Sequence, residues 1–337
     1  MLPCSDVDEY WAGNLLMQEK DENKDELVGG TDNRLGRLLV DQFAQDKDEN
    51  TDEPVGETDN RLGRLLVDQA KIKEEDIEKI LAYARKKQIR FGEAARKLRL
   101  ISKIDLELAM ASQFDYPYLE KKAGGYSREL VSAFSPFSSK GQALRVLRSQ
   151  ILLRWSQAEE RTLAIISADP GEGCSYIAAN LAVMFSQLGH KTLLVDADLQ
   201  NGRQHKIFGN FISNDTGLSS VLVGRTDYES VIYQLPFFRD LSLIPTGTAP
   251  PGLGELFNRP ELKTLVSKLR AKYDVIIFDT PPSSSNLGAD AIAAVCNNAL
   301  VVVRKDITMV SNAKTLMEQL HDARGSAVHV VGAVMNK

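Results

Sequence analysis

The residues with the clearest chemistry lie in one glycine-rich stretch, TLAIISADPGEGCSY, at positions 162–176. An apolar run at its start is typical of a buried parallel strand, and an Ala/Leu/Val-rich stretch at helical spacing follows. Gly171 and Gly173 let the backbone approach a phosphate, and the amides that begin the helix at Ser175 face it. The stretch therefore predicts a phosphate-binding loop. The residues expected to contact the ligand are Asp169, Pro170, Gly171, Glu172, Gly173, Cys174, Ser175 and Tyr176.

The loop departs from the pattern G-x-x-x-x-G-K-[ST] at two positions. Cys174 stands where the pattern has lysine, and Ala168 stands where it has the first glycine. By itself the loop is a weak signal, so its interpretation depends on the residues that surround it.

Aspartates end two further apolar runs. LLVDADLQ at 193–200 places Asp196 and Asp198 after one run, and YDVIIFDTPP at 273–282 places Asp279 after another. A strand-end aspartate beside a phosphate loop binds Mg²⁺ or its water, and the hydroxyl of Ser175 takes another coordination position. One such aspartate is usually a turn former. Three such features in this order predict a nucleotide–magnesium site.

A regular alternation of strands and helices must position these residues. Apolar runs lie at 162–167, 192–196, 240–245, 274–279, 298–303 and 327–334, and helical stretches lie between them at 175–188, 260–271, 288–295 and 310–323. This order predicts an α/β fold, a mostly parallel sheet with helices on both faces. Ligands in such sheets bind at the carboxyl ends of the strands.

A small helical domain is predicted at 59–120, before a linker at 121–139 and the α/β domain at 140–337. Its two halves share one plan, in which R-[LF]-G opens an amphipathic turn and a second helix follows. The halves begin at RLGRLLVDQAKI (61–72) and RFGEAARKLRLIS (90–102).

The first 58 residues form an acidic, duplicated arm. The segment 18–42 recurs at 45–69, and residues 1–60 carry 17 Asp or Glu against 5 Lys or Arg. Such a composition is typical of a disordered, solvated segment. A pair of tandem ligand-binding repeats is the alternative, although repeat arrays usually need more units to bury a core.

The composition excludes several classes of protein. No run of about 18 apolar residues occurs, and the acidic N-terminus lacks the order of a signal peptide. Cys4, Cys174 and Cys296 are scattered, which excludes a disulfide framework and favours a reducing cytoplasm. The positive charge after residue 60 is too diffuse to indicate nucleic-acid binding.

Residues 140–337 resemble the bacterial tyrosine kinases of capsule and exopolysaccharide synthesis, which belong to the MinD- and ParA-like P-loop NTPases. The motifs that carry the resemblance are GEGCSY, LLVDADLQNGRQH, VIIFDTPP, LIPTGTAPPGLGELF and VVGAVMN. The resemblance implies ATP and Mg²⁺ as cofactors, Asp196 and Asp198 as base and metal partners, and Asp279 beside the Mg²⁺. Asp169 stands where partitioning ATPases carry an extra lysine, which argues against such a role.

The same resemblance implies a cellular setting. Together with the N-terminal part, the chain is similar to chain-length-determinant tyrosine kinases, which act in the cytoplasm beside a membrane-anchored polysaccharide copolymerase at the inner membrane. The segment Gln142-x-x-Arg145-x-x-Arg148 resembles the one that packs kinase protomers into rings. We expect both arginines on the face of the helix opposite its leucines.

Cys174 leaves two functions open: a tyrosine kinase, or a nucleotide-binding regulator with little turnover. A replacement cation would restore transfer, and the candidates are Arg203 in the same chain and Arg145 or Arg148 from a neighbouring protomer. Cys174 at a helix N-terminus is also a candidate redox switch with a lowered pKa. The last tyrosine is Tyr273, so the C-terminal tyrosine cluster of the family is missing from this sequence.

Residues 59–113 resemble the N-terminal domain of type II secretion and pilus ATPases, which binds cyclic di-GMP in some members. The matching residues are Arg61, Leu62, Gly63, Arg90, Gly92 and Gln113. Ala70 and Arg99 replace the later glycines of the pattern, and Ala84 replaces its first glutamine. These departures argue against cyclic di-GMP and favour a docking module.

Overall fold

The structure is a computed structural model, and its chain divides into two compact units, Met1–Gln113 and Phe114–Lys337. It describes residues 57–103, 105–106, 109, 119, 125–155, 161–209, 211–249, 252–322 and 328–337. Residues 1–56 of the predicted disordered arm, Gln113 and residues 121–124 of the predicted linker lie outside these ranges, whereas residues 57 and 58 of the predicted arm are helical.

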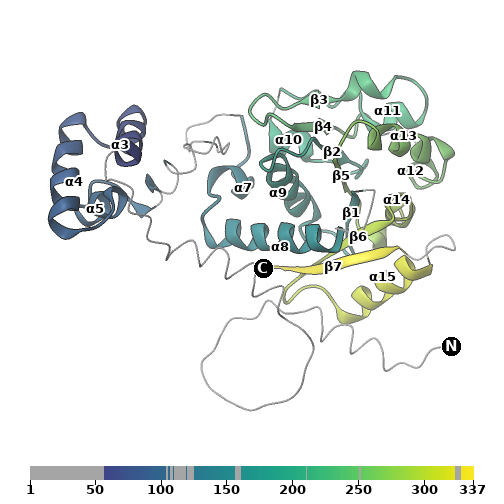
Figure 1. The fold of residues 1–337 in the computed structure, drawn as a ribbon. Helices are drawn as coiled ribbons and strands as arrows, with labels where there is room; N and C mark the ends of the chain where they lie inside the picture. Colours follow the sequence, from purple (N-terminus) through teal and green to yellow (C-terminus); the bar gives the residue numbers. More distant parts are fainter. Residues whose placement is uncertain are drawn as a thin grey trace, which may run out of the picture. The chain divides into compact units, whose positions relative to one another are not determined.

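A seven-stranded sheet forms the centre of the second unit (Figure 1). Its order is β3-β4-β2-β5-β1-β6-β7. The strands are β1 (Thr162–Ser167), β2 (Thr192–Asp196), β3 (Tyr233–Gln234), β4 (Leu241–Ile244), β5 (Val275–Asp279), β6 (Asn298–Arg304) and β7 (His329–Asn336). Only the short β3 pairs antiparallel; every other neighbouring pair is parallel. The predicted mostly parallel sheet is thus confirmed.

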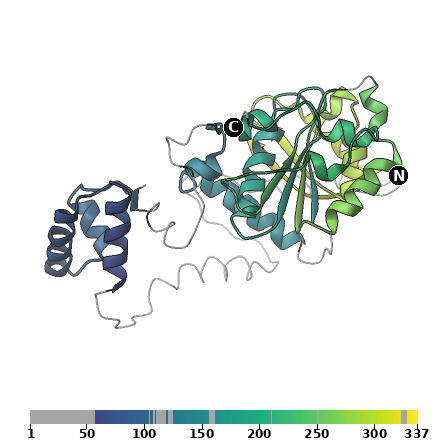
Figure 2. The ribbon, with the colours of Figure 1, turned by 90° about the horizontal axis from the view of Figure 1, so that it is seen from above.

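Helices cover both faces of this sheet (Figure 2). Along β1, Leu163 and Ile165 join one core with α7 (Val131–Phe134), α8 (Ser139–Trp155), α9 (Cys174–Ser186) and α10 (Gln204–Phe208). On the other face, α13 (Pro260–Arg270) packs on β5 and α14 (Ala289–Cys296) packs on β1 and β6. The remaining helices are α11 (Leu218–Leu222), η1 (Tyr228–Val231), α12 (Leu253–Leu256), η2 (Ser283–Ser285) and α15 (Val310–Asp322). Because both faces are covered, β1, β2 and β5 are fully buried, and β4 and β6 each have one residue that is not buried.

Helix α8 differs from its prediction at one arginine. Leu144, Ile151 and Trp155 are buried, as the apolar pattern predicts, but Arg148 is buried with them. Its guanidinium donates a hydrogen bond to the carbonyl of Met184 in α9 at 3.4 Å. The expectation that Arg148 lies on the outer face is therefore wrong, because its long side chain reaches under the helix to a backbone acceptor.

The first unit packs α3 (Glu57–Asp68), α4 (Glu74–Lys87) and α5 (Phe91–Lys97) around a small core of its own. The core residues are Leu62, Leu66, Ile72, Ile80, Ala84, Phe91, Ala94, Ala95, Ile101 and Ala109. Helix α5 ends at Lys97, and the backbone turns left-handed at Arg99, with a φ of 58°.

The two halves of this unit repeat each other in detail. Ala70 ends the first half with a φ of 52°, as Arg99 ends the second. In the first half the amide of Lys71 donates to the carbonyl of Leu66, and in the second Leu100 donates to Ala95. Next, Asp76 accepts from the amide of Lys73, and Asp105 accepts from that of Ser102. Glycine adopts such a left-handed turn without strain, and it is the residue that the pattern resembled by this segment has at these two positions.

Candidate nucleotide-binding site

The predicted phosphate loop connects the central strand β1 to α9. Gly171 and Gly173 have φ angles of 82° and 105°, values that glycine adopts without strain. Helix α9 begins at Cys174, so its first amides face the loop. A Cβ at Gly173 would lie 2.2 Å from Nδ2 of Asn336, the last residue of β7. Gly173 is therefore required for its conformation and for this close approach.

Side chains from β6, α15 and β7 hold the outer side of the loop. Arg304, at the end of β6, donates to the carbonyl of Gly171 at 3.0 Å. Asn312 in α15 donates to Oδ2 of Asp169 at 2.7 Å. Two further contacts fix Glu172: Thr308 donates to its carboxylate, and Asn336 donates to its carbonyl. Sequence analysis missed these positioning residues, because nothing in their local pattern places them at the loop.

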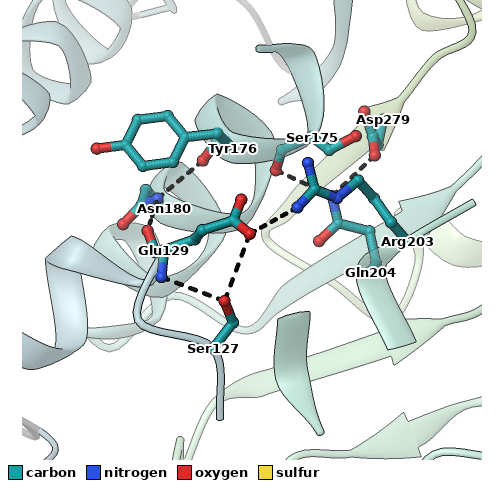
Figure 3. A network of polar contacts seen from close by, with 8 residues as sticks. All are labelled: Ser127, Glu129, Ser175, Tyr176, Asn180, Arg203, Gln204 and Asp279. Carbon is teal, nitrogen blue, oxygen red and sulfur yellow. Dashed lines mark hydrogen bonds and ion pairs between the residues drawn. The ribbon is translucent and has the colours of Figure 1, made fainter. Parts of the chain in front are cut away.

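Two aspartates lie side by side at the carboxyl edge of the sheet. Asp196 in β2 is in register with Asp279 in β5, and both side chains are fully buried. Gln204, the first residue of α10, bridges them, and Figure 3 shows its contact with Asp279. Its backbone N–H donates to Oδ2 of Asp196 at 2.9 Å, and its side-chain Nε2 donates to Oδ2 of Asp279 at 2.8 Å. The structure thus brings the predicted aspartates together and adds a residue that sequence analysis missed.

Gln204 also joins the aspartates to the loop. Its Nε2 donates to the carbonyl of Ser175 at 3.0 Å, and the Ser175 hydroxyl donates to Asp279. Ser175, Asp196 and Asp279, the three predicted metal residues, therefore lie in one hydrogen-bonded cluster. Pro170 and Gly171 lie at the exposed apex of the loop, and Tyr176 is half-buried at the start of α9.

The cluster is electrostatically unsatisfied. Oδ1 of Asp196, Oδ1 of Asp279 and Oε1 of Gln204 are buried and accept no hydrogen bond within the part of the chain that the structure describes. Burial raises the pKa of Asp279 to about 6, against the hydrogen bonds from Gln204 and Ser175. Burial and the neighbouring Asp279 raise the pKa of Asp196 well above its ordinary value. Two buried carboxylates with free oxygens favour a bound cation.

Asp198 lies beside this cluster in a less buried position. Its Oδ1 accepts the amide of Asn201 at 3.0 Å, so it also forms the turn after β2. Burial raises the pKa of Asp198, and its charge in turn raises the pKa of Asp279. Asp198 is thus both a turn residue and part of the acidic site.

Cys174 is buried at the start of α9, within the core that covers one face of the sheet. Burial strongly raises the pKa of its thiol, and the charges of Asp279, Glu172 and Asp198 raise it further. The expectation of a lowered pKa and a redox switch is therefore wrong. Desolvation and the surrounding carboxylates outweigh the effect of the helix N-terminus.

Comparison with known proteins agrees with this geometry. The family model described as AAA domain matches residues 160–327. The tyrosine-protein kinase YwqD of Bacillus subtilis is 33% identical over 65% of this chain and 90% of its own length. The putative tyrosine-protein kinase CapB of Staphylococcus aureus is 32% identical over 60% of this chain and 86% of its own length.

A solved structure shows the same fold. The kinase domain of the Escherichia coli tyrosine kinase ETK superposes with a TM-score of 0.59 at 27% identity, over 66% of this chain and 85% of that domain. The segment matched by the family model, residues 160–327, carries the loop and the paired aspartates. This chain therefore belongs to the family of bacterial tyrosine-protein kinases.

Proposed function

We propose that the second unit binds ATP with Mg²⁺ at the loop 168–175. The observation that carries the proposal is the pair of buried carboxylate oxygens, on Asp196 and Asp279, that lack a hydrogen-bond donor beside Ser175. The positive-φ glycines and the amides at the start of α9 offer the phosphate site next to them.

The residues fit Mg²⁺. This ion prefers oxygen ligands and is commonly bound by one or two carboxylates together with phosphates and waters. Asp196, Asp279 and the Ser175 hydroxyl supply such oxygens. The described ranges contain no group of three His, Cys, Asp or Glu side chains that could hold a metal ion, which suits an ion that also needs the nucleotide phosphates. When bound, Mg²⁺ neutralises the charge on the phosphates.

We propose that the chain acts as an ATP-binding, tyrosine-kinase-like protein that regulates the chain length or export of an exopolysaccharide. Asp196 and Asp198 are the proposed catalytic carboxylates. By the family resemblance, its partner is a membrane-anchored polysaccharide copolymerase, which would bring a cytoplasmic protein to the inner membrane. Arg145, half-buried on α8, remains a candidate for contacts between protomers.

A second function is favoured by Cys174: a nucleotide-binding regulatory subunit with little phosphotransfer. The thiol is buried and neutral, so it supplies no charge to the phosphates. The loss of one charge-assisted hydrogen bond weakens binding by about 1.5–3 kcal/mol. Loss of charge stabilisation in the transition state would slow transfer further.

Calorimetric titration of the full chain with Mg-ATP tests nucleotide binding. We expect binding by the wild type and little binding by Asp196→Asn, which removes the metal ligand while relieving a buried charge. Asp274→Asn is the matched control, because the exposed Asp274 directly precedes the other end of β5, where its carboxylate accepts the amide of Lys191. Absence of heat in the wild type would refute the proposal.

The variant Cys174→Lys separates the two functions. A phosphotyrosine immunoblot and a phosphate-release assay are run on both proteins with Mg-ATP. If the wild type binds Mg-ATP without transfer and Cys174→Lys gains transfer, the chain is a regulator that lost its lysine. If the wild type already phosphorylates tyrosine, the kinase function holds despite Cys174. Phosphate release without phosphotyrosine would indicate an ATPase.

A further inference from the structure

We infer that Arg203 supplies the positive charge that the loop lacks, and that Glu129 holds this arginine until a bound nucleotide phosphate displaces the glutamate. The inference rests on the proposed function and names how the same site is completed and restrained. It goes beyond Arg203 as a candidate cation, because the structure shows the group that binds it.

Arg203 and Glu129 form a contact that phosphate can replace. Nη2 of Arg203 donates to Oε1 of Glu129 at 2.6 Å, and the side chains are 45% and 40% exposed (Figure 3). An ion pair this exposed contributes little to stability. Exchange of the carboxylate for a phosphate therefore costs little, and a guanidinium binds phosphate oxygens with two donors at once.

The position of Arg203 in the chain puts it at the metal site. It directly precedes Gln204, whose side chain donates to Asp279 and to the carbonyl of Ser175. The charge of Arg203 already lowers the pKa of Asp279, against the larger effect of burial. Its long side chain thus extends from a backbone that the site holds in place, while its guanidinium stays accessible.

Glu129 is fixed to the loop helix by its backbone. Its carbonyl accepts from Nδ2 of Asn180 at 2.9 Å, and the same nitrogen donates to the carbonyl of Tyr176 at 2.8 Å. The other end of the Asn180 amide accepts the amide of Ser132 at 2.8 Å. Asn180 is fully buried. The backbone of Glu129 is therefore held against α9, and its carboxylate, which also accepts from the Ser127 hydroxyl, competes with phosphate for Arg203.

Arg304 is the other exposed arginine at the loop, and its contacts favour a different role. It donates to the carbonyl of Gly171, so it holds the loop by its backbone. Arg203, in contrast, is bound by a carboxylate, a group that a phosphate resembles in charge and geometry. Arg203 is thus the better candidate for direct phosphate contact.

A double-mutant cycle on the full chain tests the inference. The affinities of Mg-ATP and of AMP are measured by calorimetry for wild type, Glu129→Gln, Arg203→Gln and the double variant. We expect Arg203→Gln to weaken Mg-ATP by about tenfold or more. We expect Glu129→Gln to strengthen Mg-ATP by up to about fivefold. In the double variant the gain from Glu129→Gln should vanish, because the glutamate then has no Arg203 to hold.

The affinity for AMP and a conservative variant show whether the effect is direct. Loss of direct contact with the outer phosphates leaves AMP binding unchanged, whereas a distorted site weakens both nucleotides. Arg203→Lys should restore part of the Mg-ATP affinity because it keeps the charge. The matched controls are Lys206→Gln, an exposed cation on the same helix, and Glu229→Gln, an exposed glutamate paired with Lys272. We expect neither control to change the affinity.

Each outcome decides the inference. Wild-type binding of Mg-ATP that Arg203→Gln leaves unchanged would overturn it without touching the proposed function. An unchanged affinity in Glu129→Gln, or a gain that persists in the double variant, would overturn the role of Glu129. If the wild type binds no Mg-ATP, the proposed function fails and the inference fails with it.

Discussion

At the scale of single residues, the site is defined by two buried carboxyl groups whose hydrogen bonding is incomplete. Asp196 and Asp279 face each other across two parallel strands, and Gln204 satisfies one oxygen of each. The remaining oxygens lie in a medium that favours their protonated form. At the position of the usual lysine, Cys174 stays a neutral thiol. This combination makes the site depend on a bound cation and on an arginine from outside the loop.

The raised pKa of Asp279 predicts opposite pH dependences for stability and for Mg²⁺ binding. Its pKa is about 6 in the folded chain against an ordinary value of 3.8, so the folded state holds the proton more tightly. The associated stability is present at low pH and is lost as pH rises through about 6, by about 3 kcal/mol for one such group. Mg-ATP affinity should do the reverse and fall as pH drops below about 6, because Mg²⁺ needs the carboxylate.

The variant Asp279→Asn checks this prediction. It should reduce the change in the urea unfolding free energy between about pH 4 and 6, to which buried Asp196 also contributes, and abolish Mg-ATP binding at every pH. Asp274→Asn, at the exposed opposite end of β5, should retain both pH profiles of the wild type. A wild-type stability that rises through this pH range would contradict the prediction.

At the scale of elements, the loop is positioned by segments that are distant in the sequence. The ends of β6 and β7 and the start of α15 contact its outer side. Behind it, Asn180 ties α9 to the segment that leads into α7. Helix α9 has 13 residues and is almost wholly buried, so the side-chain amide of Asn180 needs hydrogen-bond partners inside the protein. Asn180 therefore connects α9, the helix that follows the loop, to the segment that contains Glu129, the partner of Arg203.

We predict that Asn180→Ala destabilises the second unit by about 2–4 kcal/mol, because it leaves buried backbone groups of Glu129 and Ser132 without their partner. Urea unfolding followed by far-UV circular dichroism measures the loss. The same change should also strengthen Mg-ATP binding slightly, since Glu129 is less firmly held. Ser149→Ala is the control: this exposed serine on α8 bonds only the carbonyl of Arg145, and we expect a change within about 0.5 kcal/mol.

At the scale of the whole molecule, the chain consists of two units with separate cores. The first unit is a twofold repeat of a short helical motif, and the second carries every residue of the proposed site. Within the described ranges, no helix is both long and apolar enough to cross a membrane. The separate cores imply that the two units unfold independently.

Leu66→Ala tests this independence. Leu66 is fully buried in the core of the first unit, and its truncation should cost that unit about 2–5 kcal/mol. Differential scanning calorimetry should show one transition moved to lower temperature and a second transition unchanged. Mg-ATP affinity should also stay unchanged. A shift of both transitions, or a loss of nucleotide affinity, would contradict separate units.

The sequence by itself determined the elements and the order of the sheet-edge residues. Apolar runs, glycines and strand-end aspartates are local patterns, and they predicted six of the seven strands, the loop at 168–175 and the strand-end positions of Asp196 and Asp279, but not the short β3. These patterns succeed because a buried parallel strand needs a continuous apolar run, and its carboxyl end must carry the polar groups of the site.

Only the tertiary structure decided which ionisable side chains are buried and which can reach the nucleotide site. Burial raised the pKa of Cys174 where its place at a helix N-terminus predicted the opposite, and it took Arg148 off the helix surface. Gln204, Arg304, Asn312 and Glu129 lie near the loop through contacts between residues far apart in the sequence. Desolvation and long-range contacts depend on how the whole chain packs, so neither can be predicted from the local pattern of residues.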